Sequence, residues 1–288
     1  MAGLTLHAYA KINLGLEVIR RRDDGYHELV TVLQTVSLYD EIAVVAGEAL
    51  TLHCDRRWMA GRRNLMWKAA DLLQKESGTQ QGAVIDLIKA IPISSGLGGG
   101  SSDAAAALRS LNNLWGLNLN LTRLAELASQ IGSDVPFFLQ GGTQMATGRG
   151  EYLEPLRTPE GQWLVLVSPD IRVPGKTPLL YGRLGPDDFT DGSMTTRLAE
   201  TLRVSGALPK ECIVNAFERA AHDTFPGLDR HKNAMFEAGA ERVHLSGSGP
   251  SLFTLVKSKC AGDALQMRLG ELGFYGVVVQ TVAAEEQI

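Results

Sequence analysis

The chain contains few cysteines, only three in 288 residues, at positions 54, 212 and 260. They lie far apart and form neither a CxxC pair nor a Cys/His cluster, which argues against a structural zinc site. An odd number of scattered thiols is typical of a reducing compartment. The first residues show no basic segment followed by an apolar block. We therefore expect no secretory signal and a cytoplasmic location.

Long apolar runs and excess basic charge are also missing. No stretch of about 18 uncharged apolar residues occurs, which predicts no membrane span. Lys and Arg total 28 against 32 Asp and Glu, a net charge of −4, so a nucleic-acid partner is not expected. Apolar residues make up 44% of the chain and charged residues 21%, as in ordinary globular proteins. The length suggests one large domain or two of ordinary size.

The clearest local pattern lies near the start, where every even position from 4 to 18 is apolar. This period of two predicts a half-buried β-strand. Lys11 and Asn13 lie on its other face, about 6–7 Å apart at the rise of a strand. A solvated sheet face is the simpler interpretation of this polar pair, and a chemical site is the alternative.

Hydrophobic periods and capping residues predict the remaining elements. Strands are expected at 29–38, 41–46, 49–54, 83–88, 163–169, 242–246, 251–256 and 274–282, and helices at 65–75, 101–113, 120–131, 196–204, 211–223, 229–238 and 261–272. Residues 141–150 indicate a flexible hairpin, and 170–195 a loop. Gly132 is expected in the left-handed conformation that ends a helix. Irregular interleaving predicts an α+β fold with domains at 1–155 and 156–288.

The strongest chemical signal is the glycine loop, which we define as residues 92–102, PISSGLGGGSS. It follows a strand and opens an alanine-rich helix. Glycines let the backbone approach a ligand, and the first helical turn favours an anion, so we predict a phosphate cradle. It fits neither the P-loop nor the dinucleotide fingerprint. Gly175-Lys176-Thr177 is not a P-loop either, because Asp170 stands where the first glycine is required.

Three further features leave alternatives open. Asp103 either caps the helix after the glycine loop, the interpretation we favour, or reaches a cation. Asp134 either caps a short turn at 133–138 or presents its carboxylate at a cleft. The 246–251 turn, Ser-Gly-Ser-Gly-Pro-Ser, is either a plain β-turn or a second part of a ligand site between two domains.

Three segments together resemble the GHMP small-molecule kinases and occur in the same order. They are AKINLGL at 10–16, PISSGLGGGSSDAAAAL at 92–108 and HLSGSGPSLF at 244–253. Two others, DGYHEL at 24–29 and IGSDVPFF at 131–138, are similar to one branch of that family. This branch phosphorylates a cytidine diphosphate conjugate of methylerythritol in isoprenoid precursor synthesis by the non-mevalonate pathway. The resemblance covers nearly the whole chain.

The resemblance implies a two-domain GHMP-kinase fold that transfers a phosphoryl group from ATP to the 2-hydroxyl of that substrate in the interdomain cleft. It implies that Asp134 takes the proton of this tertiary hydroxyl and that Lys11 lies beside Asp134. The implied substrate-binding residues are Asn13, Tyr26, His27, Thr177 and Tyr181. The implied ATP-binding residues are Asn64, Lys89, Pro92, Ile93, Ser94, Ser95, Gly96, Leu97, Gly98, Gly99, Gly100, Ser101 and Ser102. Mg²⁺ is expected to accompany the phosphates, although no obvious carboxylate pair is available to hold it.

Two other classes of protein remain to be separated from a kinase. A ligand-binding regulator could use the same fold without chemistry. Such a protein should lack Lys11, Asp134 or the glycine loop, and all three are present. An α+β protein whose glycines are only structural would show no rise in melting temperature at saturating nucleotide. The sequence carries no signal for the oligomeric state.

Overall fold

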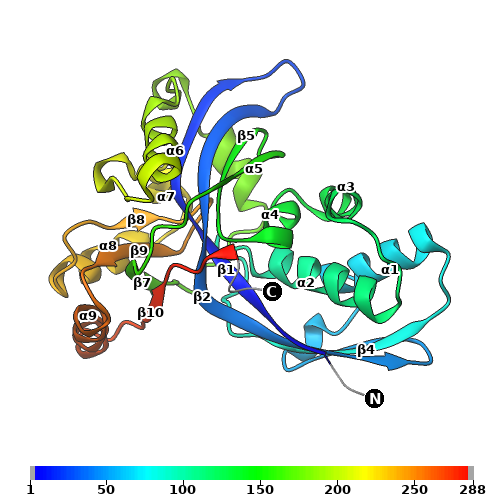
Figure 1. Ribbon diagram of the computed structural model, residues 1–288. Coiled ribbons are helices and arrows are strands. Elements are labelled where there is room, and N and C mark those ends of the chain that lie inside the picture. Colours follow the sequence, from blue (N-terminus) through cyan, green and yellow to red (C-terminus); the bar gives the residue numbers. More distant parts are fainter. Residues whose placement is uncertain (1–3, 285–288) are drawn as a thin grey trace.

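The computed structural model of the protein describes residues 4–284, in which helices pack against two sheets (Figure 1). The strands are β1 Leu4–Arg21, β2 His27–Gly47, β3 Leu50–Cys54, β4 Gly82–Ile88, β5 Thr143–Gly148, β6 Tyr152–Leu156, β7 Trp163–Val167, β8 His244–Leu245, β9 Leu252–Val256 and β10 Val277–Gln280. The α-helices are α1 Leu65–Ser77, α2 Gly99–Leu114, α3 Leu121–Ile131, α4 Val135–Gln140, α5 Lys176–Gly182, α6 Ser193–Ser205, α7 Glu218–Thr224, α8 Leu228–Glu237 and α9 Lys259–Glu271. The short 3₁₀ turns are η1 Arg57–Met59, η2 Pro186–Asp188 and η3 Lys210–Cys212.

The first sheet is built around β2. On one side β1 pairs antiparallel with almost all of β2. On the other side, residues 29–34 of β2 pair with β5, and residues 41–47 pair with β4. The sheet order is β3-β4-β2-β5-β6, with β1 attached to β2. The β1–β2 pair runs through the middle of the molecule, so it borders both the α1–α4 side and the α6–α9 side (Figure 1).

The second sheet is antiparallel, in the order β10-β7-β9-β8, and α9 packs on β7, β9 and β10. Isolated bridges connect it and its helices to the first sheet. Leu16 of β1 pairs with Asn215, Val18 pairs with Phe189, and Val36 of β2 pairs with Thr281 just after β10. The second half of β1 and the middle of β2 are thus held by elements from the C-terminal part of the chain.

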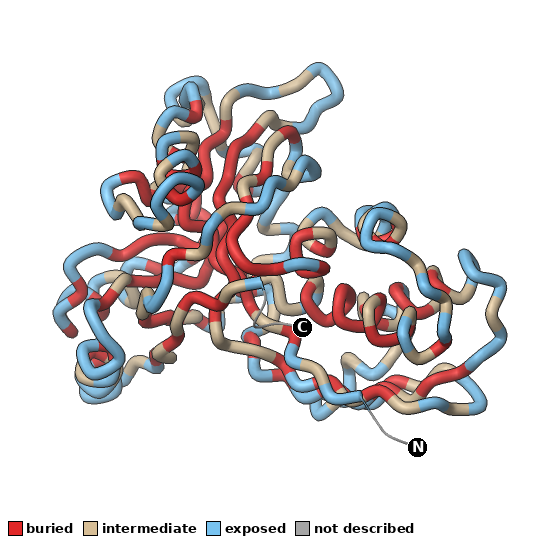
Figure 2. The backbone as a smooth tube through the Cα atoms, in the orientation of Figure 1, coloured by how far each residue is buried: buried red, intermediate tan, exposed pale blue. Residues whose placement is uncertain are grey.

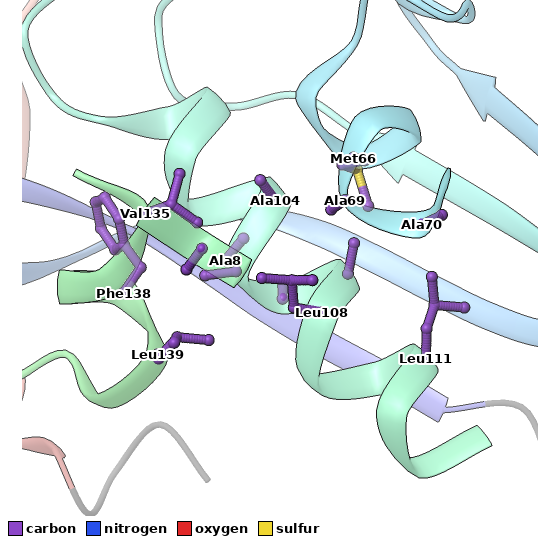
Figure 3. Close-up of a cluster of buried hydrophobic side chains, with 14 of the residues drawn as sticks. Ala8, Met66, Ala69, Ala70, Ala104, Leu108, Leu111, Val135, Phe138 and Leu139 are labelled. Carbon is purple, nitrogen blue, oxygen red and sulfur yellow. The ribbon is translucent and has the colours of Figure 1, made fainter. Parts of the chain in front are cut away.

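The even-numbered residues of β1 are buried along its centre, as the period of two predicts. Ala8 belongs to the apolar cluster of α1–α4, where Leu108 and Phe138 also pack (Figure 3). Ile12 packs with residues of the second sheet and α6, and Val18 packs with the C-terminal helices. Figure 2 shows that burial continues along these central strands. The expectation of a half-buried strand is wrong, however, because the odd-numbered residues at the centre of β1 are buried too.

Several local predictions need correction. Residues 27–47 form one strand, because β1 pairs with residues 27–36 and 39–44 and β4 pairs with residues 41–47. Residues 143–148 are a regular strand between β2 and β6. The expected 170–195 loop contains α5, and the expected 211–223 helix is divided into η3 and α7. Gly132 has a φ of 178°, so it is extended and not left-handed, and the chain leads directly into the next turn. No helix among residues 4–284 has the length and hydropathy to cross a bilayer.

Candidate active site

Lys11 and Asn13 lie next to each other on β1 and are buried, so the interpretation as a solvated face is wrong. Lys11 Nζ donates to Asn13 Oδ1 at 2.7 Å, and Asn13 Nδ2 donates to Thr31 Oγ1 at 2.8 Å. Thr31 in turn donates its hydroxyl to the carbonyl of Gly15 at 2.5 Å. Because the Thr31 proton is directed at Gly15, this hydroxyl accepts from Asn13 and fixes the amide oxygen of Asn13 toward Lys11.

Asp134 meets Lys11 from the opposite direction. It stands at the N-cap position of α4, after the turn from α3, yet its side chain makes no capping hydrogen bond. Its Oδ2 lies 3.7 Å from Lys11 Nζ, and its side chain is 45% exposed while that of Lys11 is 6% exposed. Burial lowers the pKa of Lys11, and the charge of Asp134 opposes this shift. Of the two alternatives for Asp134, the structure shows the cleft carboxylate.

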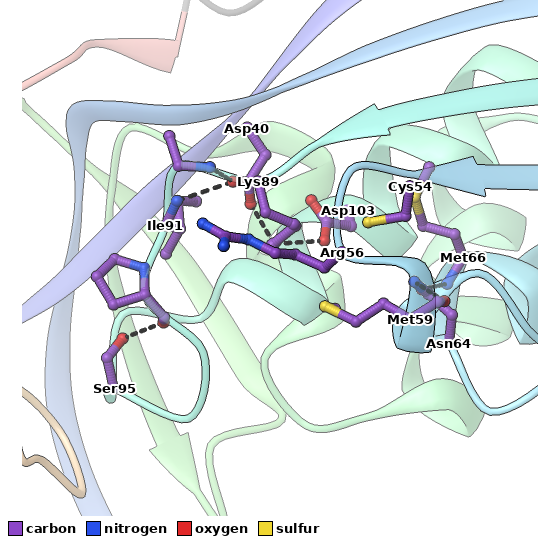
Figure 4. A network of polar contacts seen from close by, with 12 residues as sticks. Asp40, Cys54, Arg56, Met59, Asn64, Met66, Lys89, Ile91, Ser95 and Asp103 are labelled. Carbon is purple, nitrogen blue, oxygen red and sulfur yellow. Dashed lines mark hydrogen bonds and ion pairs between the residues drawn. The ribbon is translucent and has the colours of Figure 1, made fainter. Parts of the chain in front are cut away.

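The glycine loop is attached to this polar pair through the backbone. The N–H of Lys11 donates to the carbonyl of Leu97 at 2.9 Å, beyond the edge of the sheet. Within the loop, Ser95 Oγ donates to the carbonyl of Pro92 at 2.7 Å (Figure 4). No side chain caps the first turn of α2, which begins at Gly99. A helix N-terminus therefore lies at the loop, where an anion is favoured.

The 246–251 turn packs between the glycine loop and the polar pair. At Gly96 (φ +90°), an added Cβ would lie 2.5 Å from the carbonyl oxygen of Ser246. At Gly247 (φ +53°), it would lie 2.8 Å from Asn13 Oδ1 and 3.0 Å from Lys11 Nζ. Both positions thus require glycine for their backbone angle and for the close approach. The turn is therefore part of the candidate site and not a plain connection.

Lys89 lies in a buried ion cluster behind the glycine loop. Its ammonium donates to Asp40 and, at 2.7 Å, to Asp103, and all three side chains are at most 3% exposed (Figure 4). Asp40 also accepts from the backbone N–H groups of Ala90 and Ile91. The two carboxylates outweigh burial and raise the pKa of Lys89. Burial raises the pKa of Asp103 to about 7, although Lys89 opposes the shift.

This cluster corrects the favoured interpretation of Asp103, which is not a cap but reaches a cation, the ammonium of Lys89. Because the cluster joins α2 to β2 and to the end of β4, it holds the start of α2 in place. The side chain of Asn64 is also engaged, since it accepts from Met66 N at 2.9 Å as the predicted cap of α1 and donates to the carbonyl of Met59 at 3.1 Å (Figure 4). The contacts of Asn64 and Lys89 with a nucleotide stay predictions.

A cavity of about 1310 Å³ opens beside Lys11 and Asp134. It is lined by all seven residues predicted for catalysis and substrate binding: Lys11, Asn13, Tyr26, His27, Asp134, Thr177 and Tyr181. The rings of His27 and Tyr181 stack at a centroid distance of 4.7 Å and an angle of 21°. Thr177 Oγ1 donates to Ser248 Oγ at 3.1 Å. The cavity thus has aromatic groups and a hydroxyl beside an ammonium–carboxylate pair.

Sequence reasoning missed several residues of this site. Thr31 orients Asn13 from β2, and only the register of β1 on β2 reveals that contact. Arg149 lines the cavity and lies 4.5 Å above the ring of the exposed Tyr26. Lys176, considered only as part of a failed P-loop match, donates its ammonium to the carbonyl of Gly249. In the sequence, only their position beside glycines pointed to Arg149 and Lys176 as site residues.

Comparisons with known sequences agree with this geometry. The model "GHMP kinases N terminal domain" matches residues 64–142, and "GHMP kinases C terminal" matches residues 197–273. The 4-diphosphocytidyl-2-C-methyl-D-erythritol kinase of Dehalococcoides mccartyi is 41% identical over 280 residues, which cover 97% of this chain and 98% of that protein. The protein of the same name from Bacillus cereus is 40% identical over 258 residues, 88% of each chain.

Solved structures show the same likeness in three dimensions. A crystal structure of 4-(cytidine 5'-diphospho)-2C-methyl-D-erythritol kinase matches with a TM-score of 0.81 and 35% identity, over 96% of this chain and 99% of that one. A homoserine kinase of Cytophaga hutchinsonii matches with a TM-score of 0.76 but only 20% identity, over 99% and 96% of the two chains. The second likeness concerns the fold alone.

Proposed function

The chain belongs to the GHMP kinases, in the family of 4-diphosphocytidyl-2-C-methyl-D-erythritol kinases, and from this premise we propose that it phosphorylates the 2-hydroxyl of 4-diphosphocytidyl-2-C-methyl-D-erythritol with ATP. The products are the 2-phosphate and ADP. The observation that carries the proposal is the convergence of Lys11 and Asp134, 3.7 Å apart, at a cavity lined with aromatic side chains.

The reaction forms one bond and breaks another. The oxygen of the tertiary hydroxyl bonds to the γ-phosphorus, the bond from this phosphorus to the β–γ bridging oxygen breaks, and its electron pair leaves with ADP. Asp134 takes the hydroxyl proton, for which its half-exposed carboxylate is suited. Lys11 offsets the negative charge on the transferring group, and Asn13 holds Lys11 in place. Phosphoryl transfer depends mainly on such positioning and charge neutralisation.

ATP is proposed to bind with its phosphates at the glycine loop. The N-terminus of α2 and the close packing of the 246–251 turn support this position. Asn64 and Lys89 would contribute there by fixing α1 and α2. Among the described residues, no group of three His, Cys, Asp or Glu side chains could hold a metal. Mg²⁺ would enter with the phosphates and would supply neutralisation of their charge.

The cytidine end of the second substrate is proposed to occupy the aromatic part of the cavity. His27 and Tyr181 already stack on each other, and Tyr26 exposes 58% of its surface beside them. Flat aromatic faces suit a pyrimidine base, and Thr177 lies on the same wall. We also propose a domain boundary near residue 155, between β6 and β7, and a cytoplasmic location, which the three free thiols support.

The test is a substrate panel with the purified protein, ATP and Mg²⁺. ADP release is expected with 4-diphosphocytidyl-2-C-methyl-D-erythritol and not with homoserine or mevalonate. ³¹P NMR of the product should show a new phosphomonoester beside the intact diphosphate. Turnover of homoserine or mevalonate without turnover of the cytidine compound would overturn the substrate. ATP binding without turnover of any of the three would favour a regulator that has lost its chemistry.

A further inference from the structure

Lys176 is the first residue of α5, and neither the catalytic pair nor the aromatic cavity accounts for it. Its ammonium donates to the carbonyl of Gly249 in the 246–251 turn, and the side chain is half-buried. The neighbouring Thr177 donates to Ser248 of the same turn at 3.1 Å. Two consecutive side chains at the start of α5 are thereby fixed on one turn.

The Gly249 carbonyl locates this ammonium with respect to the glycine loop. It lies 2.9 Å from the point where a Cβ of Gly96 would stand. On its other side the same turn touches the catalytic pair, because a Cβ at Gly247 would lie 3.0 Å from Lys11 Nζ. Lys176 therefore lies where the glycine loop, the 246–251 turn and Lys11 meet.

The charges at this junction do not balance. Lys11 and Lys176 are both cations, and Asp134 is the carboxylate that acts on both. No carboxylate of residues 4–284 forms an ion pair with Lys176. Burial lowers the pKa of Lys176 to about 8, Lys11 adds to this shift, and Asp134 opposes it. A positive charge that is partly removed from water and has no ion-pair partner is unfavourable, and a bound anion would offset this cost.

We propose that Lys176 is a second cationic residue of the reaction, which binds the γ-phosphoryl group of ATP opposite Lys11 and stabilises it during transfer. This inference rests on the proposed function. Lys176 keeps its proton and forms no covalent bond. Its ammonium exchanges the carbonyl of Gly249 for phosphoryl oxygens, while the proton of the substrate hydroxyl still passes to Asp134.

The test compares K176M and K176R with the wild-type enzyme and with R172M. Arg172 is a suitable control because it is exposed, lies in the same segment and pairs with Asp170 at 3.0 Å. For each protein we would measure kcat, both KM values and the melting temperature. Calorimetry would give the affinities for ADP and for β,γ-imido-ATP, both with Mg²⁺.

K176M is expected to lower kcat about 10²-fold, as the loss of one preorganised electrostatic contact does. K176M should also lower the affinity for β,γ-imido-ATP, while the affinity for ADP stays within about twofold of the wild-type value. Only the analogue carries the third phosphate. K176R should regain part of both losses, since it keeps the charge but not the shape. R172M should behave as the wild type.

Other results would overturn the proposal. If K176M lowered the affinities for ADP and for the analogue equally and also lowered the melting temperature, Lys176 would only support the 246–251 turn. A raised KM for the cytidine substrate with unchanged nucleotide affinity would assign Lys176 to that substrate's diphosphate. Unchanged kcat in K176M would refute the role while leaving the kinase assignment intact, whereas an inactive wild-type enzyme would refute the proposed function.

Discussion

The carboxylate of Asp134 stands 3.7 Å from the ammonium of Lys11, one half-exposed to the cavity and the other almost fully buried. The pair therefore presents an acceptor for a proton at the surface and a fixed positive charge behind it. Asp134 makes no capping hydrogen bond that a substitution would remove, and Lys11 keeps its hydrogen bond to Asn13 when Asp134 is replaced. Substitutions there should affect chemistry more than folding.

D134N is expected to lower kcat by about 10²- to 10⁴-fold, because it removes the proposed general base. Affinity for ADP should stay unchanged, since ADP is proposed to bind at the glycine loop. The pKa of Lys11 should fall further, because Asp134 now opposes the lowering effect of burial. ADP-release kinetics would check kcat, and calorimetry would check the affinity for ADP. D170N, at an exposed carboxylate 83% accessible, is the matched control, and a fully active D134N would remove Asp134 from the mechanism.

T31V should reduce both stability and turnover. It leaves the amide of Asn13 and the carbonyl of Gly15 without their partner, at a cost of about 1–3 kcal/mol for an unsatisfied buried group. T31S should restore both properties. T35V is the control, because Thr35 is equally buried but its hydroxyl has no hydrogen-bond partner among the described residues. Urea unfolding should show T35V to be neutral or stabilised, and equal effects of T31V and T35V would contradict the proposed orientation of Asn13.

G247A should inactivate the enzyme by pushing Asn13 and Lys11 apart, since its new Cβ would lie within 3.0 Å of both polar atoms. G227A imposes a similar left-handed residue (φ +84°) where nothing lies within 4 Å. It should cost only the backbone strain, about 1–2 kcal/mol, and keep normal kcat. The difference in kcat between the two variants, at equal fractions folded, isolates the contact from the strain. Loss of activity in both would attribute the effect to strain.

K89M should be strongly destabilising, because it leaves Asp40 and Asp103 buried without a cation. Removing one partner of a buried ion pair costs about 3–5 kcal/mol. K75M is the control, since Lys75 pairs with Asp71 on the exposed face of α1 and such pairs contribute about 0.3–0.5 kcal/mol. Chemical denaturation measures both variants. A K89M protein as stable as K75M would show that the cluster does not hold α2.

Asp103 should make stability depend on pH. Its pKa is about 7 in the folded protein against an ordinary value of 3.8, so the folded state binds more protons between these values. The contribution of Asp103 to the free energy of unfolding is therefore full below about pH 4 and decreases as pH rises toward 7. D103N removes this titration, so the stability of the wild type relative to D103N should fall over that interval. A difference that is constant or grows with pH would be contrary to this direction.

The sequence was informative where a local pattern decides the outcome. The period of two in β1 correctly predicted that Lys11 and Asn13 share a face, and Asn64 and Asn120 cap α1 and α3 as their positions predict. Asp103 was misread because helix position suggests a cap, whereas its cation arrives from the end of β4. Thr31 and Lys176 could not be predicted, since their partners lie far away in the sequence. Contacts set by register and by packing between the two sheets leave no local signal.

The amide of Lys11 is bonded to the carbonyl of Leu97, so the loop proposed for the donor phosphates and the lysine facing the acceptor are one mechanical unit. A shift of the loop would have to break this hydrogen bond or move the middle of β1. β1 in turn is clamped by the cores on both sides. With the proposed binding positions, donor and acceptor would therefore be aligned by one strand that both sites share.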